Sequence, residues 1–210
     1  MSIKINNPAG FVLIGGASSR MGSDKAQMSI GGRQLFERSA AALNSICRGS
    51  VTLVGEADYA HSFQIIPDIN IDPTTHSRAS IYGLYTALAF AKTPWIAVLA
   101  CDLPFVTGDL MTRLAVYCSN EFDAVIPIQP DAKPQPLCAF YRREGCLQVV
   151  EAMVGNDELK IQNFLSRINT RFVEFDEIAD LDGSANFFLN VNKPEDYQAA
   201  AEIAAVDAYQ

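Results

Sequence analysis

The chain has 210 residues, 49% of them hydrophobic and 19% charged, which excludes a disordered or fibrous protein and allows one domain with a large core. Its formal net charge is -8 at pH 7, and because it has no run of Lys or Arg we expect no binding to nucleic acid. No apolar run approaches the ~18 residues of a membrane span, and the first ten residues lack the apolar core of a signal peptide, so we expect a cytoplasmic protein without a membrane partner.

Hydrophobic periodicity predicts strands that alternate with helices through the first two thirds of the chain. The predicted strands are FVLIGG (11–16), SVTLVG (50–55), QIIPD (64–68), WIAVLACD (95–102) and DAVIPI (123–128). The predicted helices are RQLFERSAAALNSI (33–46), GLYTALAFAK (83–92) and DLMTRLAVYC (109–118), the last with Thr107 as its N-cap. This alternation is typical of a mainly parallel sheet that is covered by helices on both faces and binds ligands at the carboxyl ends of its strands.

The second half of the chain is less regular. Predicted strands there are PLCAFYRR (136–143), TRFVEFDE (170–177) and FFLNVN (187–192), with a helix over IQNFLSRI (161–168) and an alanine-rich helix that starts at Pro194. No repeat or linker interrupts the pattern, so we predict a single domain over residues 1–210. The five cysteines contain no C-x-x-C pair, which argues against a zinc site or a disulfide framework and favours buried core thiols.

A glycine-rich loop with two cations, Arg20 and Lys25, follows the first predicted strand in FVLIGGASSRMGSDKA (11–26). The backbone N–H groups of such a loop and its positive charges suit an anionic group such as a phosphate. The loop is not a Walker A motif, because two residues separate its last glycine from Lys25, and the G-x-G-x-x-G fingerprint is absent. Gly15 and Gly16 would let the backbone approach a triphosphate, which Arg20 and Lys25 would neutralise.

The loop sequence L-x-G-G-x-S-x-R-M-G-x-D-K resembles that of the molybdenum cofactor guanylyltransferases, the MobA-type nucleotidyltransferases. Their pattern is LAGGxSxRMGxDKA, from which this chain departs at one fixed position, with Ile14 in place of Ala. The resemblance continues through QIIPD, VLACDLPFV, PQPLCAFY and FLNVNKPEDY, almost to the end of the chain. It implies a three-layer α/β/α Rossmann-like nucleotidyltransferase fold with a mostly parallel central sheet.

The resemblance also implies the roles of individual residues. It implies a nucleotide site of Leu13, Ile14, Gly15, Gly16, Lys25, Asp68 and Asp102, catalytic roles for Arg20, Lys25 and Asp102, and an acceptor site of Gln135, Pro136, Asn190 and Asn192. Asp102 would in addition hold Mg²⁺, the implied cofactor. A carboxylate at the carboxyl end of a central strand is well placed to hold this ion against bound phosphates.

The residues themselves leave simpler interpretations open. Asp102 also fits a helix cap or a loop, and Asp68 is equally typical of a turn. Asn190 and Asn192 alternate along a predicted strand and would point to the same side, but they also fit an Asx turn before the helix at Pro194. The segment that carries Gln135 and Pro136 is otherwise an ordinary proline-flanked loop.

The implied activity is transfer of GMP from GTP to the terminal phosphate of molybdopterin, or of Mo-molybdopterin, with release of pyrophosphate and formation of the guanine dinucleotide cofactor. An attacking phosphate monoester is already an anion near neutral pH, so no general base is needed. Transient contacts with molybdenum-insertion proteins and with molybdoenzymes are a further expectation from the resemblance.

Besides Ile14, two departures from the family affect the choice among activities. The family commonly has a Gly-Pro-Leu-x-Gly turn near the guanine, where this chain has ASIYG (79–83), and it usually has Thr where Lys193 stands. The nearest alternative is a cytidylyltransferase that uses CTP for the same acceptor, although Gly15 and Asp24 favour guanylyl transfer. Sugar-phosphate and isoprenoid-precursor nucleotidyltransferases are the next alternatives. A non-catalytic nucleotide-binding partner protein is an alternative of a different class, motivated by Ile14, Lys193 and ASIYG.

Overall fold

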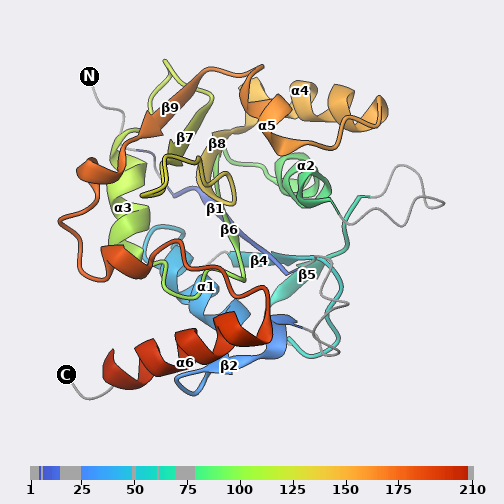
Figure 1. The fold of residues 1–210 in the computed structure, drawn as a ribbon. Helices are drawn as coiled ribbons and strands as arrows, with labels where there is room; N and C mark the ends of the chain where they lie inside the picture. Colours follow the sequence, from blue (N-terminus) through green and yellow to red (C-terminus); the bar gives the residue numbers. More distant parts are fainter. Residues whose placement is uncertain are drawn as a thin grey trace.

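A seven-stranded sheet with the strand order β5-β4-β1-β6-β8-β7-β9 forms the centre of the molecule (Figure 1). The computed structural model describes residues 5, 7–14, 25–48, 51–60, 62–69 and 79–207. The strands are β1 (Ala9–Leu13), β4 (Val51–Val54), β5 (Gln64–Ile66), β6 (Trp95–Ala100), β7 (Ala124–Pro127), β8 (Cys138–Arg142) and β9 (Thr170–Val173). β8 is antiparallel to β6 and β7 and the other pairs are parallel, which confirms the mostly parallel sheet.

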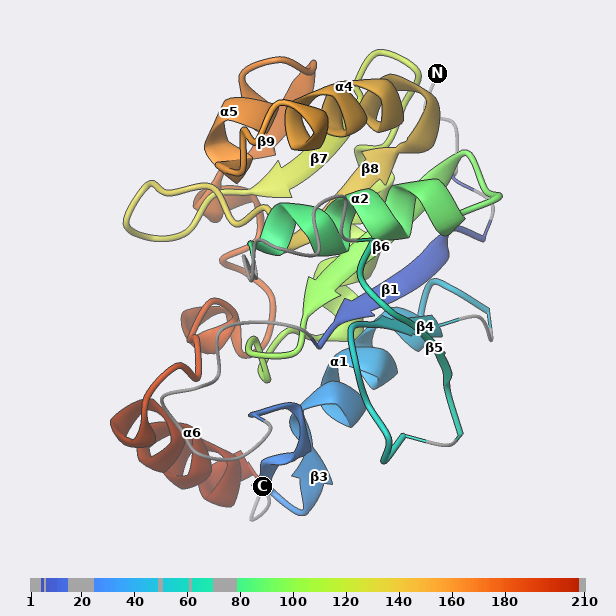
Figure 2. The same cartoon turned by 90° about the vertical axis from the view of Figure 1, so that its right-hand side faces the viewer.

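Helices cover both faces of this sheet (Figures 1 and 2). α1 (Leu35–Asn44) and α3 (Gly108–Val116) pack on one face, and α2 (Ser80–Phe90), α4 (Arg143–Gly155) and α5 (Ile161–Leu165) on the other. Side chains alternate between the two faces along each strand, so Val12 belongs to one core whereas Phe11 and Leu13 belong to the other. The three-layer α/β/α fold predicted from the sequence is therefore confirmed.

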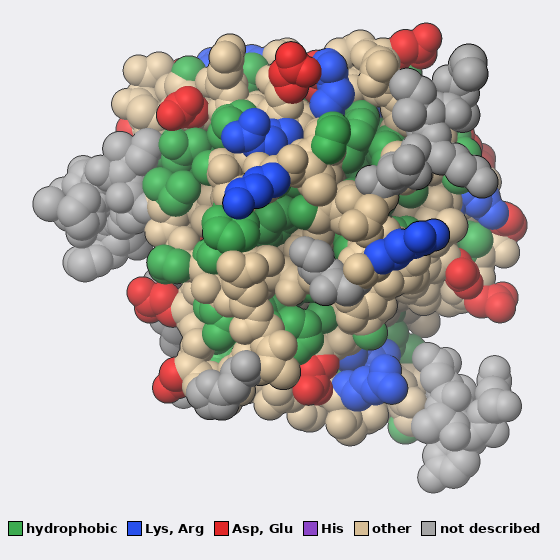
Figure 3. All heavy atoms as spheres, turned by 180° about the vertical axis from the view of Figure 1, so that it is seen from behind, with side chains coloured by type: hydrophobic (Ala, Val, Ile, Leu, Met, Phe, Trp, Pro, Cys, Tyr) green, Lys and Arg blue, Asp and Glu red, His purple; other side chains and the backbone are tan. Residues whose placement is uncertain are grey.

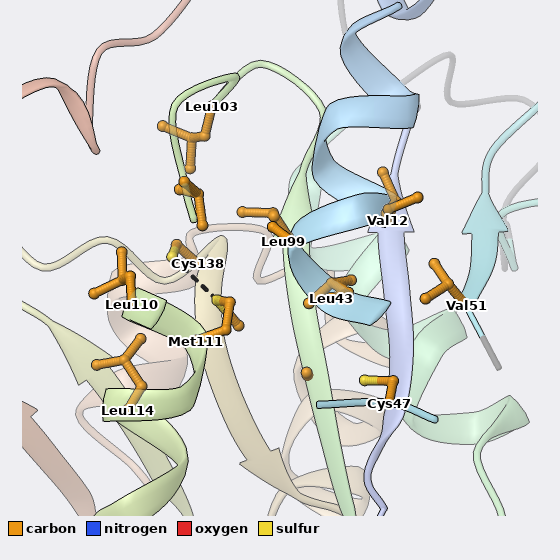
Figure 4. Packing of buried hydrophobic residues seen from close by; sticks show 14 of the residues in the cluster. Val12, Leu43, Cys47, Val51, Leu99, Leu103, Leu110, Met111, Leu114 and Cys138 are labelled. Carbon is orange, nitrogen blue, oxygen red and sulfur yellow. Dashed lines mark hydrogen bonds between the residues drawn. The ribbon is translucent and has the colours of Figure 1, made fainter. Parts of the chain in front are cut away.

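Figure 4 shows aliphatic and sulfur-containing side chains of the core under α1 and α3, a core that also contains aromatic side chains. The Cys138 thiol donates a weak hydrogen bond to the Met111 sulfur, at 3.9 Å, between β8 and α3. All five cysteines are buried thiols outside any disulfide, as predicted for core thiols. Burial raises the pKa of Cys47 to about 12, so this thiol stays protonated and unreactive.

Most predicted elements occur where the sequence placed them, but one helix was missed. Thr107 caps α3 as predicted, because its Oγ1 accepts a hydrogen bond from the Leu110 N–H at 3.3 Å. The sequence analysis predicted no helix over α4, although Cys146, Val150 and Met153 recur at helical spacing and are buried against the sheet.

The predicted last strand, FFLNVN (187–192), is wrong. The chain forms a 3₁₀ turn, η4 (Ser184–Asn186), and then runs on without pairing in the sheet. The Val191 N–H donates a hydrogen bond to the carbonyl of Asp102, which lies two residues after β6, at 3.0 Å. β6 has β1 on one side and β8 on the other, so no edge beside it is open to a further strand. The apolar run reflects burial of Phe187, Phe188 and Val191 rather than strand pairing.

The C-terminal helix α6 (Pro194–Asp207) lies outside the two helical layers, beside a small hairpin of β2 (Ser29–Ile30) and β3 (Arg33–Gln34), as Figures 1 and 2 show. The helix and hairpin share a third, smaller core. Its buried members are Ile30, Leu35, Phe105, Val191, Ala200 and Ala204. This core connects the end of the chain with segments that follow β1 and β6.

The surface opposite to the view of Figure 1 carries Lys and Arg side chains interspersed with Asp and Glu and with apolar patches (Figure 3). Neither sign of charge dominates the described part of that face. Among the described residues, no helix has the length and apolar character that a membrane crossing would require.

Candidate active site

Three polar side chains from distant parts of the sequence meet at the carboxyl end of β6. The Lys25 ammonium donates hydrogen bonds to Asp102 Oδ2 at 3.0 Å and to Asn192 Oδ1 at 2.8 Å. Lys25 and Asn192 are 167 positions apart in the sequence. The side chains of Lys25 and Asp102 are 13% and 25% exposed, so the ion pair is partly shielded from water. We call Lys25, Asp102 and Asn192 the lysine cluster.

Backbone hydrogen bonds hold the Asp102 side of this cluster. The Leu103 N–H donates to the Ala100 carbonyl at 3.3 Å and turns the chain directly after β6. Val191 donates to the Asp102 carbonyl at 3.0 Å, which places the segment before α6 against this turn. Among the described residues, Asp102 Oδ1 has no hydrogen-bond partner, so one carboxylate oxygen is free to bind a cation.

The donor set at Asp102 suits a metal that takes part of its ligands from a substrate. Within the described ranges, no three His, Cys, Asp or Glu side chains come together as a metal site. Mg²⁺ often binds to one or two carboxylates and completes its shell with water and substrate phosphates. A single carboxylate oxygen at the end of a central strand fits that requirement, whereas it would not make a self-contained protein site for zinc.

The end of β1 lies beside the lysine cluster. Cys101 donates its N–H to the Leu13 carbonyl at 3.0 Å, and Ile14 donates to the Val54 carbonyl at 2.9 Å. Leu13 and Ile14 are both buried, with their side chains in opposite cores of the sheet. Their side chains therefore position the strand end, and a ligand would meet their backbone. The predicted site residues Gly15, Gly16 and Arg20 lie outside the described residues.

Asp68 lies against the first turn of α2. A Cβ atom built on Gly83 would be 3.5 Å from Asp68 Oδ1 and 3.3 Å from both Leu13 methyl groups, so a side chain here would crowd the site. The ASIYG segment thus forms the start of a helix, with Ala79 as its N-cap residue. Desolvation, and then the like charge of Glu56, raise the pKa of the Asp68 carboxyl above its ordinary value.

A surface hollow of about 460 Å³ opens at the carboxyl ends of β4 and β5, next to Asp68 in the chain. It is lined by Gly55, Glu56, Ala57, Asp58, Tyr59, Ile65 and Pro67. Gly55 turns the chain there with φ of 131°, which side chains of L residues rarely allow. Ligand pockets typically measure roughly 300–1,000 Å³, so the hollow is large enough for a nucleoside. Glu56 was not singled out from the sequence, although it lies two residues after the parallel strand β4.

The predicted acceptor residues fall into two groups. Gln135 and Pro136 are buried in the loop between β7 and β8, where Gln135 donates its N–H to the Pro127 carbonyl at 2.9 Å and Pro136 accepts from the Tyr141 hydroxyl at 2.7 Å. Neither residue forms a hydrogen bond with the lysine cluster. The Gln135 side chain has no hydrogen-bond partner among the described residues, and the residue is 8% exposed.

Asn190 and Asn192 do not share a strand face, which corrects the sequence prediction. Asn192 belongs to the lysine cluster, whereas Asn190 Nδ2 donates to the carbonyl of Phe188, two residues before it, at 3.2 Å. Because residues 187–192 form no strand, the alternation that would direct both amides to one side does not apply.

Residues 10–171 match the model of the MobA-like NTP transferase domain, which is most of the chain. The chain belongs to this family. A relative named "Probable molybdenum cofactor guanylyltransferase", from Bacillus anthracis (strain CDC 684 / NRRL 3495), is 29% identical over 195 residues, which cover 91% of this chain and 94% of the relative.

Two solved structures show the same fold. Molybdopterin-guanine dinucleotide biosynthesis protein A from Archaeoglobus fulgidus matches with a TM-score of 0.74 and 25% identity over 94% of this chain and 99% of the other. The 2-C-methyl-D-erythritol 4-phosphate cytidylyltransferase from Thermus thermophilus matches with a TM-score of 0.68 and 17% identity over 95% and 99%. At that identity, the second likeness concerns the fold alone.

This MobA-like chain is therefore a nucleotidyltransferase. The residues matched by the family model include Lys25, Asp68 and Asp102, and they end before Asn192. Asn192, one of the three members of the lysine cluster, thus lies beyond the matched part of the chain.

Proposed function

We propose that this nucleotidyltransferase transfers GMP from GTP to the terminal phosphate of molybdopterin or Mo-molybdopterin, releases pyrophosphate and forms the molybdopterin guanine dinucleotide cofactor. The observation that carries the proposal is the lysine cluster at the carboxyl end of β6. The names of the Bacillus anthracis relative and of the Archaeoglobus fulgidus protein support the choice of acceptor and nucleotide. We further propose that residues 1–210 act as one nucleotidyltransferase domain.

Lys25 is suited to contact a phosphate without leaving its present partners. An ammonium group has three N–H donors, and two of them are used by Asp102 and Asn192. No acceptor among the described residues takes the third, which would serve a phosphate oxygen, and the two acceptors fix the direction in which it points. A charge held in this way requires no reorganisation when negative charge develops on the α-phosphoryl group and on the leaving pyrophosphate.

Asp102 would hold Mg²⁺ through its free oxygen, and the bound ion would neutralise phosphate charge. Arg20 would add a guanidinium fork to the phosphates, and the backbone at Leu13, Ile14, Gly15 and Gly16 would line them. The acceptor phosphate needs no base to remove a proton, because it is already anionic. The chemistry we assign to the protein is therefore positioning and charge stabilisation.

The choice of guanine rests on Asp68 and Glu56 near the hollow at the ends of β4 and β5. Guanine presents two adjacent N–H donors, N1–H and the N2 amino group, on one edge, and a carboxylate accepts two parallel hydrogen bonds. The pairing edge of cytosine offers an amino group followed by two acceptors, which would face the negative charge. Transfer of CMP to the same acceptor is the alternative activity, and a comparison of GTP with CTP as substrates distinguishes the two.

The acceptor would bind on the side of Gln135 and Pro136, with Asn190 and Asn192 across from them. The Gln135 amide supports this placement, since it has no hydrogen bond with the described residues and both donors and acceptors to offer a pterin. Asn192 would then sit between the acceptor side and Lys25. Molybdenum-insertion proteins and molybdoenzymes would be transient partners for delivery and release of this cofactor.

The test is pyrophosphate release with molybdopterin-type cofactor as acceptor, run in parallel on GTP, CTP, ATP and UTP, with and without Mg²⁺. We expect release with GTP that requires both the acceptor and Mg²⁺. A preference for CTP would replace the proposal with the cytidylyl activity. GTP binding without acceptor-dependent pyrophosphate would instead make the chain a nucleotide-binding partner protein.

A further inference from the structure

The first turn of α6 holds the backbone on which Asn192 sits. Asp196 Oδ2 accepts hydrogen bonds from the N–H groups of Asn192 and Lys193, each at 2.8 Å. A side-chain acceptor for the free N–H groups at a helix start is a helix cap, here supplied from inside the helix because Lys193 cannot accept a hydrogen bond with its side chain. The same carboxylate thus starts α6 and fixes the residue that contacts Lys25.

Asn192 is restrained from both sides. On its N-terminal side, Val191 donates to the Asp102 carbonyl at 3.0 Å, and on its C-terminal side Asp196 accepts from Asn192 and Lys193. With the backbone fixed at both positions, the Asn192 side chain has a defined direction towards Lys25. Asn192 itself is exposed, so packing contributes little to this direction.

α6 also contacts the segment that follows Lys25. The Tyr197 hydroxyl donates to the Ser29 carbonyl in β2 at 2.8 Å, and Ala200 of α6 shares the third core with Ile30 and Phe105. Figures 1 and 2 show α6 beside the hairpin of β2 and β3. The helix therefore contacts the segments that carry all three members of the lysine cluster.

We infer that Asp196 is a positioning residue for nucleotidyl transfer, which acts through Asn192 to hold the Lys25 ammonium in place. Asp196 forms no hydrogen bond or ion pair with Lys25 or Asp102, so its effect on the reaction passes through the backbone of Asn192 and Lys193. The kinetic part of this inference rests on the proposed function, whereas its structural part concerns the geometry of Asn192 alone.

The chain offers a matched control for Asp196. Glu195 is the neighbouring acid in the first turn of α6, is exposed and forms no hydrogen bond with a described residue. Glu195→Ala removes the same charge from the helix start without removing the cap. Asp196→Asn removes the charge but keeps a side-chain oxygen that can accept the same N–H groups.

The kinetic test measures kcat for Asp196→Ala, Asp196→Asn and Glu195→Ala. We expect Asp196→Ala to lower kcat by roughly tenfold, because small misplacements of catalytic groups have effects of this size or larger. Asp196→Asn should restore kcat to within about threefold, and Glu195→Ala should keep it. In the Asn192→Ala background, Asp196→Ala should have no further effect. A loss in Glu195→Ala equal to that in Asp196→Ala, or additive losses in the double variant, would overturn the inference.

A second measurement needs no turnover. The side-chain amide signals of Asn192 in ¹H–¹⁵N NMR spectra, assigned by their loss in Asn192→Ala, should shift in Asp196→Ala and stay in place in Glu195→Ala and Asp196→Asn. Unmoved signals in a folded Asp196→Ala protein would overturn the inference. If the wild-type chain released no pyrophosphate with any nucleotide, the proposed function would fail, and the NMR result would still decide whether Asp196 positions Asn192.

Discussion

The central sheet and the C-terminal segment, residues 184–207, contribute to the lysine cluster in different ways. Asp102 follows β6, whose six residues are all buried and which has a paired strand on each side. Asn192 is exposed and lies on an unpaired stretch that is held by hydrogen bonds from Val191 and to Asp196 and by a small core under α6. The packing that stabilises the fold therefore positions Asp102, whereas a few polar contacts position Asn192.

We expect the largest decrease in kcat when either charged side chain of the lysine cluster is removed. Lys25→Ala and Asp102→Ala should each lower kcat by at least about 10²-fold, as removal of a preorganised charge does in other active sites. Lys25→Arg is the companion variant, because it keeps the charge and loses the geometry of the ammonium group. Steady-state pyrophosphate release measures all three. Rates near wild type in Lys25→Ala or Asp102→Ala would exclude the cluster as the active site.

The two regions should also differ in how stability and activity are coupled. Leu99→Ala in the core beneath α1 should lower the free energy of unfolding by about 2–5 kcal/mol and leave the kcat of the folded protein near wild type. Val191→Ala in the third core should cost about 2 kcal/mol or less, since it removes a smaller buried side chain, yet lower kcat more than Leu99→Ala does. Urea unfolding and kinetics on the same samples separate the two effects. Equal losses of kcat would contradict the distinction between the regions.

The same contrast explains what the sequence predicted. β1 and β6 are continuous apolar runs, and such runs identify buried parallel strands well, so the position of Asp102 at a strand end was predictable. FFLNVN is also apolar, but its burial comes from a separate core and a turn, which periodicity cannot distinguish from a strand. α4 was missed because polar residues interrupt its buried positions, although their helical spacing was present.

The contact between Lys25 and Asn192 was beyond sequence reasoning for a different reason. The two residues are 167 positions apart, and each lies in a motif that suggested a separate role, one for the nucleotide and one for the acceptor. Hydrogen-bond partners across such a distance depend on how α6 packs on the hairpin of β2 and β3, which no local pattern encodes. Glu56, by contrast, was predictable, since it follows β4 as Asp102 follows β6.

Base selection should depend on Asp68, which follows the edge strand β5. Asp68→Asn should reduce the preference for GTP over CTP by about tenfold, because it replaces one of two acceptor oxygens with a donor and a tenfold change corresponds to one hydrogen bond of about 1.4 kcal/mol. Competition binding with GTP and CTP measures the ratio. An unchanged ratio in Asp68→Asn would show that another residue selects the base.

The raised pKa of Asp68 gives this assignment a pH signature. The carboxyl is protonated at a higher pH in the folded than in the unfolded chain, so it favours folding at low pH and this contribution is lost as the pH rises through the folded-state pKa. GTP binding should change in the opposite direction, weakening as the pH falls through the same range, because the protonated carboxyl accepts fewer hydrogen bonds. Binding isotherms for wild type and Asp68→Asn between pH 4 and 8 test this, and the variant should lack the dependence.

The smallest expected effects are the losses of stability on removal of two helix caps. Thr107 caps α3 on the sheet and Asp196 caps α6, and removal of either cap should cost about 1 kcal/mol of the free energy of unfolding. Thr107→Ala should nevertheless keep wild-type kcat, because the Asp102 turn that precedes it is held by β6 and by Val191 rather than by the cap. Chemical denaturation and pyrophosphate release on Thr107→Ala and Asp196→Ala form the comparison. If Thr107→Ala lost as much kcat as Asp196→Ala at the same loss of stability, general loosening of the fold would account for both variants, and the C-terminal segment would have no separate role in positioning the cluster.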